Sequence, residues 1–208
     1  MDTRTELLKA AAVVFSQHGF RGSTTRRIAD AAGVNEVTLF RYFKSKEALL
    51  HEAITSCSEG PVVMPLPATP LDPEREIADW GESLIARLRS RGSIIRKCMS
   101  EIEERPEMIS TAVATPLRAA SDLAAYLRKL KALEATDPDF DILAASAMLM
   151  GAIFHDAMGR EMMPHAFPAV TKAPRLYSRL LLNAIGYRAD RLSPSDSEGR
   201  KQKQPLSS

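Results

Sequence analysis

The chain has 208 residues, of which 45% are hydrophobic and 26% charged, and its formal net charge is +2. This composition is typical of a globular protein with a buried core and excludes an intrinsically disordered chain. Residues 1–55 and 188–208 are mildly basic and the middle is mildly acidic, a gradient that suits a DNA-binding end without proving one.

Neither the cysteines nor the apolar segments indicate a metal or a membrane protein. Cys57 and Cys98 follow no ligand-like spacing, so we expect no zinc site and no disulfide framework. The first six residues carry charges where a secretory signal needs an apolar run. The longest apolar stretch, residues 142–154, has 13 residues, whereas a spanning helix needs roughly 20. We therefore expect a cytoplasmic protein without a membrane segment.

Helical periodicity runs through almost the whole chain and predicts an all-α fold. The first helix is expected over residues 3–18, with Leu7 and Phe15 on its buried face, and should end at Gly19. A fourth helix should begin after Ser45 and run to about residue 57. Between these two, residues 24–43 predict two short helices joined by a tight turn, which is the layout of a helix-turn-helix.

Caps and small residues support this helix-turn-helix. Thr24 or Thr25 can cap its first helix with a hydroxyl oxygen, and Asn35 can cap its second. Ala29 is small enough to let the two helices approach closely. Gly33 occupies the point of chain reversal, a position that usually needs a positive φ.

The anchor residues extend on both sides of the motif. Gly19-Phe20 precede it, and Tyr42-Phe43 and Ser45-Lys46-Glu47-Ala48-Leu49 follow it. This run resembles the N-terminal domain of the TetR/AcrR family of transcriptional repressors. The family often has Ser, a variable residue and Gly where this chain has Asn35-Glu36-Val37, and often Tyr where it has Phe40.

The resemblance implies the fold and the partners. It implies an N-terminal three-helix helix-turn-helix DNA-binding domain, followed by a helical ligand-binding and dimerisation domain. It also implies a homodimeric repressor that binds a palindromic operator in double-stranded DNA and is released by a small, largely apolar effector. It implies no cofactor and no enzymatic activity, and the sequence has no phosphate-cradling glycine loop, nucleophile elbow or metal spacing.

The resemblance also implies how the helix-turn-helix docks on DNA, and this gives nine residues a role in binding. The helix from Asn35 to Tyr42 would enter the major groove, where Arg41 suits a bidentate contact to guanine. Asn35 and Thr38 could read adenine or a thymine methyl group, and Glu36 could accept from cytosine or exclude wrong bases. The expected phosphate contacts are Thr25, Arg26, Tyr42 and Lys46, and Phe40 is expected to pack and to contact the DNA backbone. The alternative is that these are solvated surface residues, or core in the case of Tyr42.

Composition divides the chain into four segments. Residues 1–55 form the predicted DNA-binding domain, 56–73 a Pro-rich linker, 74–188 the regulatory and dimerisation domain, and 189–208 a disordered tail. The tail ends in Arg200-Lys201-Gln202-Lys203, which is either solvated or in contact with DNA.

Prolines and acidic caps set the expected helices of residues 74–188. They are residues 74–89 after Asp72-Pro73, residues 93–103, a helix that restarts after Pro106 and runs to about 133, residues 138–159 after Asp137, and residues 174–186. Pro116 should bend or break the third of these.

The last two helices carry the predicted dimer face, where paired copies would form a four-helix bundle. Its residues are Ile142, Leu149, Ile153, Leu176, Leu180 and Ala184. The alternative is that these stripes face the core of their own chain.

The middle helices are expected to surround the effector, since methionine and aromatic side chains adapt to irregular apolar ligands. The expected lining residues are Trp80, Leu84, Leu88, Met99, Ile102, Met108, Leu123, Tyr126, Met150 and Phe154. The same residues fill ordinary cores, so a DNA-binding dimer without an inducer stays open as an alternative. An all-helical enzyme or ligand-binding protein is the remaining one.

Overall fold

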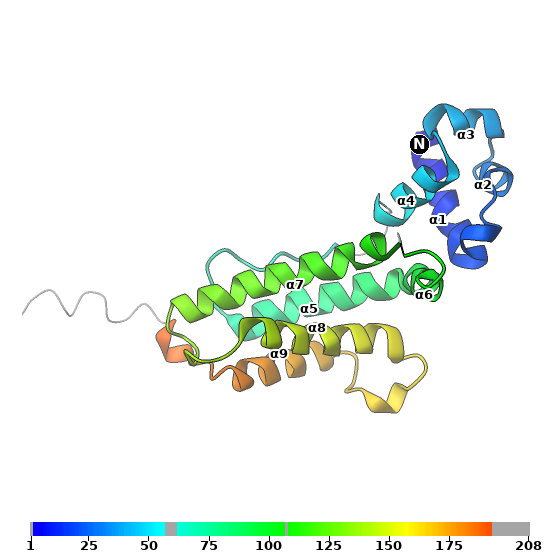
Figure 1. Ribbon diagram of the computed structural model, residues 1–208. Coiled ribbons are helices and arrows are strands. Elements are labelled where there is room, and N and C mark those ends of the chain that lie inside the picture. Colours follow the sequence, from blue (N-terminus) through cyan, green and yellow to red (C-terminus); the bar gives the residue numbers. More distant parts are fainter. Residues whose placement is uncertain (1, 57–61, 107, 193–208) are drawn as a thin grey trace, which may run out of the picture.

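The computed structural model describes residues 2–56, 62–106 and 108–192, and over these ranges the chain is helical without a strand. The elements are α1 (Thr3–Gly22), α2 (Thr25–Ala31), α3 (Glu36–Tyr42), α4 (Lys46–Ser56), α5 (Pro73–Ser90), α6 (Gly92–Glu101), α7 (Met108–Ala132), α8 (Ile142–Gly159) and α9 (Ala173–Ala184), with the short 3-10 helices η1 (Pro164–Ala166) and η2 (Ala189–Arg191). Helices α1 to α4 form a head at one end of an elongated body, which contains α5 and α7 to α9 side by side (Figure 1). The all-α prediction is confirmed.

The head is built on one apolar core. Leu7 and Phe15 of α1, Ile28 of α2, Leu39 of α3 and Leu49 of α4 all have fully buried side chains in it. At about 25 cal/mol per Å² of apolar surface, burial of such side chains stabilises the head by roughly 2 kcal/mol each. The core therefore fixes α2 and α3 against the longer helices α1 and α4.

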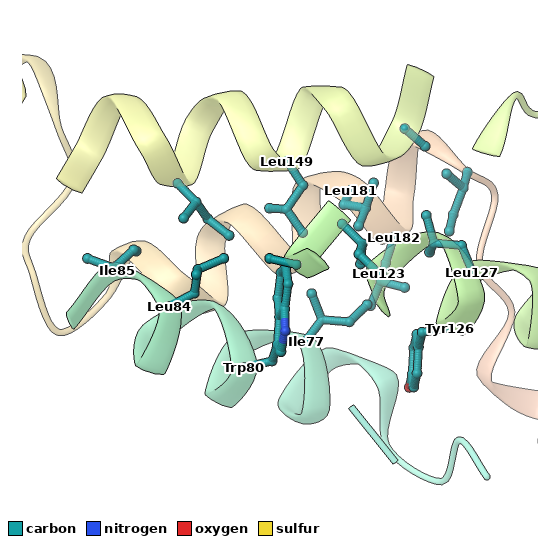
Figure 2. Close-up of a cluster of buried hydrophobic side chains, with 14 of the residues drawn as sticks. Ile77, Trp80, Leu84, Ile85, Leu123, Tyr126, Leu127, Leu149, Leu181 and Leu182 are labelled. Atoms are coloured by element: carbon teal, nitrogen blue, oxygen red, sulfur yellow. The ribbon is translucent and has the colours of Figure 1, made fainter. Parts of the chain in front are cut away.

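The body has its own core, in which aromatic and leucine side chains from four helices meet (Figure 2). Trp80 and Leu84 of α5 face Leu123 of α7, Leu149 of α8 and Leu181 of α9 across the bundle. All five are at most 4% exposed. The body is therefore a packed helical bundle.

Helix α6 joins the head to the body. Its C-terminal residue Glu101 accepts the backbone N–H of Phe20 with both carboxylate oxygens, at 3.0 and 3.1 Å. Phe20 follows Gly19, whose φ of +66° interrupts α1 at the expected position. At the other end of α6, Arg91 donates to the backbone oxygen of Ile54 near the end of α4.

The Pro-rich segment lies against the body over its described part, residues 62–72. Val63 and Leu66 pack on the body core. The backbone N–H of Met64 donates to Ser83 Oγ at 2.9 Å, and Lys129 Nζ donates to the Pro67 oxygen at 3.4 Å. Residues 57–61 of the predicted linker lie outside the described residues.

The body helices differ from the sequence prediction at two places. Pro116 does not break α7, which runs on from Met108 to Ala132; the proline removes one backbone hydrogen bond, while residues beyond it, such as Leu123, stay anchored in the core. Asp137 does not cap α8. Asp141 does so, because its carboxylate accepts the N–H of Ala144 at 2.7 Å.

Asp137 has a different role, which explains why the helix starts late. Its backbone N–H donates to the Ile185 oxygen at 3.0 Å, and its carboxylate pairs with Arg188 at 3.2 Å. These contacts fasten the segment before α8 to the end of α9. Residues 189–192, expected to belong to the disordered tail, are ordered, since η2 is formed and Leu192 packs on the core. Residues 193–208, with the basic cluster at 200–203, lie outside the described residues.

Helix α8 extends beyond the apolar stretch of residues 142–154 that the sequence showed. Within the described residues it is the one helix long and apolar enough to cross a membrane, by length and composition alone. It packs against α5, α7 and α9 and buries the polar side chains of Ser146 and Asp156 inside the bundle. These contacts are those of a core helix in a bundle.

Candidate DNA-binding interface

Helix α3 is attached to the head by one side only. Leu39 is its buried residue and packs with Ile28 and Ala29 of α2. Gly33, with φ of +68°, makes the turn between the two helices, as expected. The remaining side chains of this short helix are half-buried or exposed, so α3 presents most of its surface outward.

The start of α3 is closed by a cap within the helix. Asn35 Oδ1 accepts both the backbone N–H of Thr38 at 2.8 Å and its hydroxyl at 2.9 Å. The predicted cap is confirmed. Two of the predicted base-reading groups therefore bind each other in this structure.

Glu36 turns back toward α2, against the outward direction expected. The Thr25 hydroxyl donates to Glu36 Oε2 at 2.6 Å, and both side chains are half-buried. A hydroxyl offered by the first residue of α2 satisfies the carboxylate locally. This bond ties the starts of α2 and α3 together.

The outer face of α3 carries apolar and cationic side chains. Val37 is 72% exposed, Phe40 51% and Tyr42 43%. Arg41 is exposed on the same helix and Arg26 on α2. Phe40, expected as a packing residue, thus projects half its side-chain surface into solvent.

Two of the cations near the turn already have partners in the head. Lys46 Nζ donates to the Phe20 oxygen at 3.1 Å and lies 4.1 Å from the centre of the Phe20 ring. Arg27 donates to the Gly22 oxygen at 2.6 Å. Lys44 is exposed just after α3, and sequence reasoning missed it.

Val37, exposed on the outer face of α3, is not among the residues predicted from the sequence. A signal for it existed, because Phe40 and Arg41 lie three and four residues further along the same helix face. Sequence reasoning passed over the position because it searched for side chains able to form hydrogen bonds.

The residues predicted for the dimer face divide between two sides of α8 and α9. Leu149 and Ile153 are 4% and 1% exposed and lie in the core of their own chain, with Ile142 packed against it. Leu176, Leu180 and Ala184 are exposed on α9. The α8 residues therefore follow the alternative that the apolar stripe faces the core of its own chain, because this stripe of α8 packs inside the helical bundle.

The residues predicted to line an effector pocket are mostly packed core. Trp80, Leu84, Leu88, Leu123 and Tyr126 are at most 2% exposed, and Met150 and Phe154 pack against them. Met99 is 53% exposed on α6, Ile102 is half-buried after it, and the side chain of Met108 lies outside what the structure describes.

A pocket that the structure shows in the body lies elsewhere, between α5, α8 and the start of α9. It contains none of the predicted lining residues and is lined by Glu82, Ile85, Ala86, Arg89, Asp156, Val170, Ala173 and Pro174. Its wall is mainly apolar, with charged groups at Glu82, Arg89 and Asp156.

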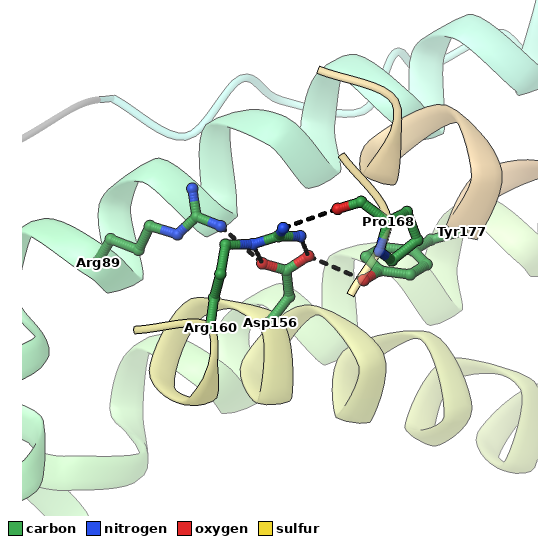
Figure 3. Close-up of polar contacts among 5 residues, drawn as sticks. All are labelled: Arg89, Asp156, Arg160, Pro168 and Tyr177. Atoms are coloured by element: carbon green, nitrogen blue, oxygen red, sulfur yellow. Dashed lines mark hydrogen bonds and ion pairs between the residues drawn. The ribbon is translucent and has the colours of Figure 1, made fainter. Parts of the chain in front are cut away.

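Asp156 forms the most extensive polar network of the body (Figure 3). Its fully buried carboxylate accepts from Arg160 at 2.7 and 2.5 Å, from Arg89 at 2.6 Å and from the Tyr177 hydroxyl at 2.8 Å. Burial alone would raise the pKa of Asp156, but the bonds from Arg160, Tyr177 and Arg89 outweigh it and hold this pKa below its usual range. Burial, and then the bond to Asp156, raise the pKa of Tyr177 to about 12.

Over the described residues, no three His, Cys, Asp or Glu side chains come together in a way that could hold a metal ion. Burial, and then the nearby Glu101 carboxylate, raise the pKa of the Cys98 thiol to about 11, so this cysteine stays protonated at neutral pH.

A short exposed helix, held by a capped turn on a compact head and joined to a helical body, defines a helix-turn-helix protein. Residues 7–53 match the family described as bacterial regulatory proteins, tetR family. The matched residues lie within α1 to α4, the helices of the head.

Curated relatives are similar to parts of this chain, and a solved structure shares its fold. The HTH-type transcriptional repressor KstR2 of Rhodococcus jostii is 47% identical over 51 residues, which are 24% of this chain and 25% of that protein. The uncharacterised HTH-type transcriptional regulator YvkB of Bacillus subtilis is 28% identical over 130 residues, 62% of this chain and 67% of that protein. The TetR family transcriptional regulator PfmR from Thermus thermophilus shares the fold, with a TM-score of 0.59 and 21% identity over 85% of this chain and 97% of that chain.

The likeness is unevenly distributed along the chain. The match to KstR2 spans about a quarter of the length of that repressor, and the family model covers residues 7–53. The relatives named above are transcriptional regulators and not enzymes.

Proposed function

We propose that the protein is a sequence-specific DNA-binding transcriptional regulator that acts in the cytoplasm as a homodimeric repressor of a palindromic operator. The observation that carries this proposal is the outer face of α3, where Val37, Phe40 and Arg41 project from a helix capped at its start. Such a helix fits the major groove, where base edges differ in their donors, acceptors and methyl groups.

The contacts to DNA divide into base readers and phosphate binders. Arg41 has an exposed guanidinium for a bidentate contact to guanine. Arg26, Tyr42 and Lys44 flank α3 and suit phosphate contacts, which fix register without reading sequence. Lys46 keeps its predicted role only through the N–H groups that it does not donate to Phe20.

The proposed dimer forms through the outer stripes of α8 and α9. These stripes carry Leu143, Ala144, Ala147, Met148 and Gly151 on α8 and Leu176, Leu180 and Ala184 on α9, all exposed in the single chain. The leucines supply apolar area, and the alanines and glycine let two helices approach closely. Symmetry-related α8 and α9 would then form a four-helix interface.

Release by a small, largely apolar effector is the regulatory part of the proposal. The pocket beside Arg89 offers apolar walls of Ile85, Val170 and Pro174. Because α6 holds the head at Phe20 and Ile54, a ligand that shifts the body against α6 would change the orientation of α3. Such a ligand binds the conformation with misaligned heads more tightly, and this difference in ligand affinity sets how far it lowers the affinity for DNA.

A second candidate function is DNA binding without an inducer. It is favoured by the tight packing of the predicted pocket residues around Trp80 and Leu123. Release of a bound operator by small apolar molecules would support the effector-controlled regulator, and retention of the operator with all of them would support this second candidate.

The proposal is tested by selecting bound fragments from a random DNA pool with the wild type, Arg41→Ala and Arg128→Ala. Arg128 is an exposed arginine of α7 in the body and serves as the matched control. We expect one palindrome with the wild type and the control, and a loss of preference at one base position per half-site with Arg41→Ala, about 1–3 kcal/mol. No enrichment with the wild type would contradict sequence-specific binding.

A further inference from the structure

The exposed side of α3 has an apolar component that the fold of the head does not require. Val37 is 72% exposed and Phe40 51%, and the two lie three residues apart on one face of the helix. Isolated exposed apolar residues are ordinary on protein surfaces. Here, however, they sit together on the surface proposed to enter the major groove, with the exposed cations Arg26 and Arg41 on the same head.

The polar residues beside Val37 are occupied within the head. Asn35 Oδ1 takes both hydrogen bonds from Thr38, and Glu36 takes the hydroxyl of Thr25. These bonds reduce the acceptors that the first turn of α3 can offer to base edges. Of the three residues Glu36, Val37 and Thr38, Val37 alone is exposed, and its side chain is apolar.

Resting on the proposed function, we propose that Val37 is a specificity-determining residue that reads the C5 methyl group of a thymine in the major groove. Among the four bases, thymine alone presents a methyl group there. A β-branched side chain is stiff at χ1, so its two methyl groups are held in one place. The first turn of a recognition helix is also the part that reaches base edges.

The flanking charges indicate DNA as the occupant of this face. Arg41 shares the face with Val37, Arg26 lies on the neighbouring helix, and Lys44 follows α3. Their positive charge suits the phosphate backbone on both sides of a groove. An apolar protein partner would gain nothing from this ring of cations.

The proposed contact predicts how much the DNA affinity falls when the thymine methyl group is removed. Burying one carbon of this kind is worth about a fourfold change in affinity. Replacing the contacted thymine by deoxyuridine removes the methyl group and leaves the base pairing unchanged. We therefore expect about fourfold weaker binding when one half-site is changed, and about fifteenfold when both are.

The experiment measures the affinity of the full chain for the operator recovered from the random pool, with each thymine replaced in turn by deoxyuridine. The variants are the wild type, Val37→Ala and, as matched control, Val62→Ala, an exposed valine of the Pro-rich segment that lies outside every proposed site. Since Val37 is exposed, its truncation leaves the head core intact.

We expect one thymine per half-site at which deoxyuridine weakens the wild type and the control, while Val37→Ala binds the two operators within about 1.5-fold of each other. A wild type insensitive to every deoxyuridine, or a Val37→Ala variant that keeps the full penalty, would overturn this inference while the proposed function stands. Recovery of no operator at all would overturn the proposed function and the inference together.

Discussion

At the scale of single residues, Asp156 places a buried charge inside the body. It is fully buried, and its charge is balanced by Arg160, which is itself mostly buried, and by Arg89. Removing one partner of a buried ion pair leaves the other uncompensated, which costs about 3–5 kcal/mol. Asp137 is the matched control, because it pairs with Arg188 on the surface and its loss should change the free energy of unfolding little.

We predict that Asp156→Asn lowers the free energy of unfolding at pH 7 by about 3 kcal/mol, whereas Asp137→Asn changes it by less than about 0.5 kcal/mol. Because the pKa of Asp156 is held below its usual range, its contribution is present above the carboxyl pKa of the unfolded chain and is lost as pH falls through the folded value. The difference between wild type and Asp156→Asn should therefore narrow in acid. Urea unfolding at neutral and acidic pH measures it, and equal stability of the two variants at pH 7 would contradict it.

Residue-level prediction from sequence succeeded where the chemistry is local. The caps at Asn35 and Ser45 and the positive φ of Gly33 follow from neighbouring residues in the chain. It did not anticipate the hydrogen-bond partners of Glu36 and Lys46, because Thr25 and Phe20 come from other helices. Tertiary contacts of this kind have no periodic signature in the sequence.

At the scale of elements, α6 holds head and body together, alongside the packing of α4 on α7. Glu101 is 18% exposed at its side chain and accepts the Phe20 N–H with both oxygens. Glu104, three residues further on, pairs with Arg21 on the surface with its side chain 65% exposed. The first contact is partly shielded from water and charge-assisted, and the second is screened.

We predict that Glu101→Gln destabilises the head by about 1–2 kcal/mol and that Glu104→Gln leaves it unchanged within about 0.5 kcal/mol. Amide hydrogen exchange checks this, since faster exchange in α1 and α4 with unchanged exchange in α8 would show weakened attachment of the head. Equal protection of α1 in both variants would show that α6 does not hold the head through Glu101.

The existence of the helices was predictable from the sequence, whereas their ends were predictable only in part. The period of apolar residues located the nine α-helices found in the described parts of the chain, since burial of one face repeats along each of them. The continuity of α7 through Pro116 and the late start of α8 depend on packing against other helices. A pocket could not be told from a core either, since both use the side chains of residues such as Trp80 and Leu123.

At the scale of the whole molecule, two heads must be placed on one DNA duplex for a palindrome to be read. One seven-residue helix contacts few base pairs, so the specificity of a single head is small. The outer stripes of α8 and α9 are the surface proposed to join the copies. Leu180, 64% exposed on α9, lies within them, and Leu71, 77% exposed before α5, lies outside them.

The most direct test is sedimentation of the protein with the recovered operator and with one half-site, using the wild type, Leu180→Arg and the control Leu71→Arg. We predict two copies of the wild type and of the control on the operator, with affinity for the half-site weaker by at least about 100-fold. Leu180→Arg should sediment as a monomer and bind both DNAs equally weakly. A single wild-type chain bound with the same affinity to the operator and to the half-site would contradict the account of a dimeric, sequence-specific regulator.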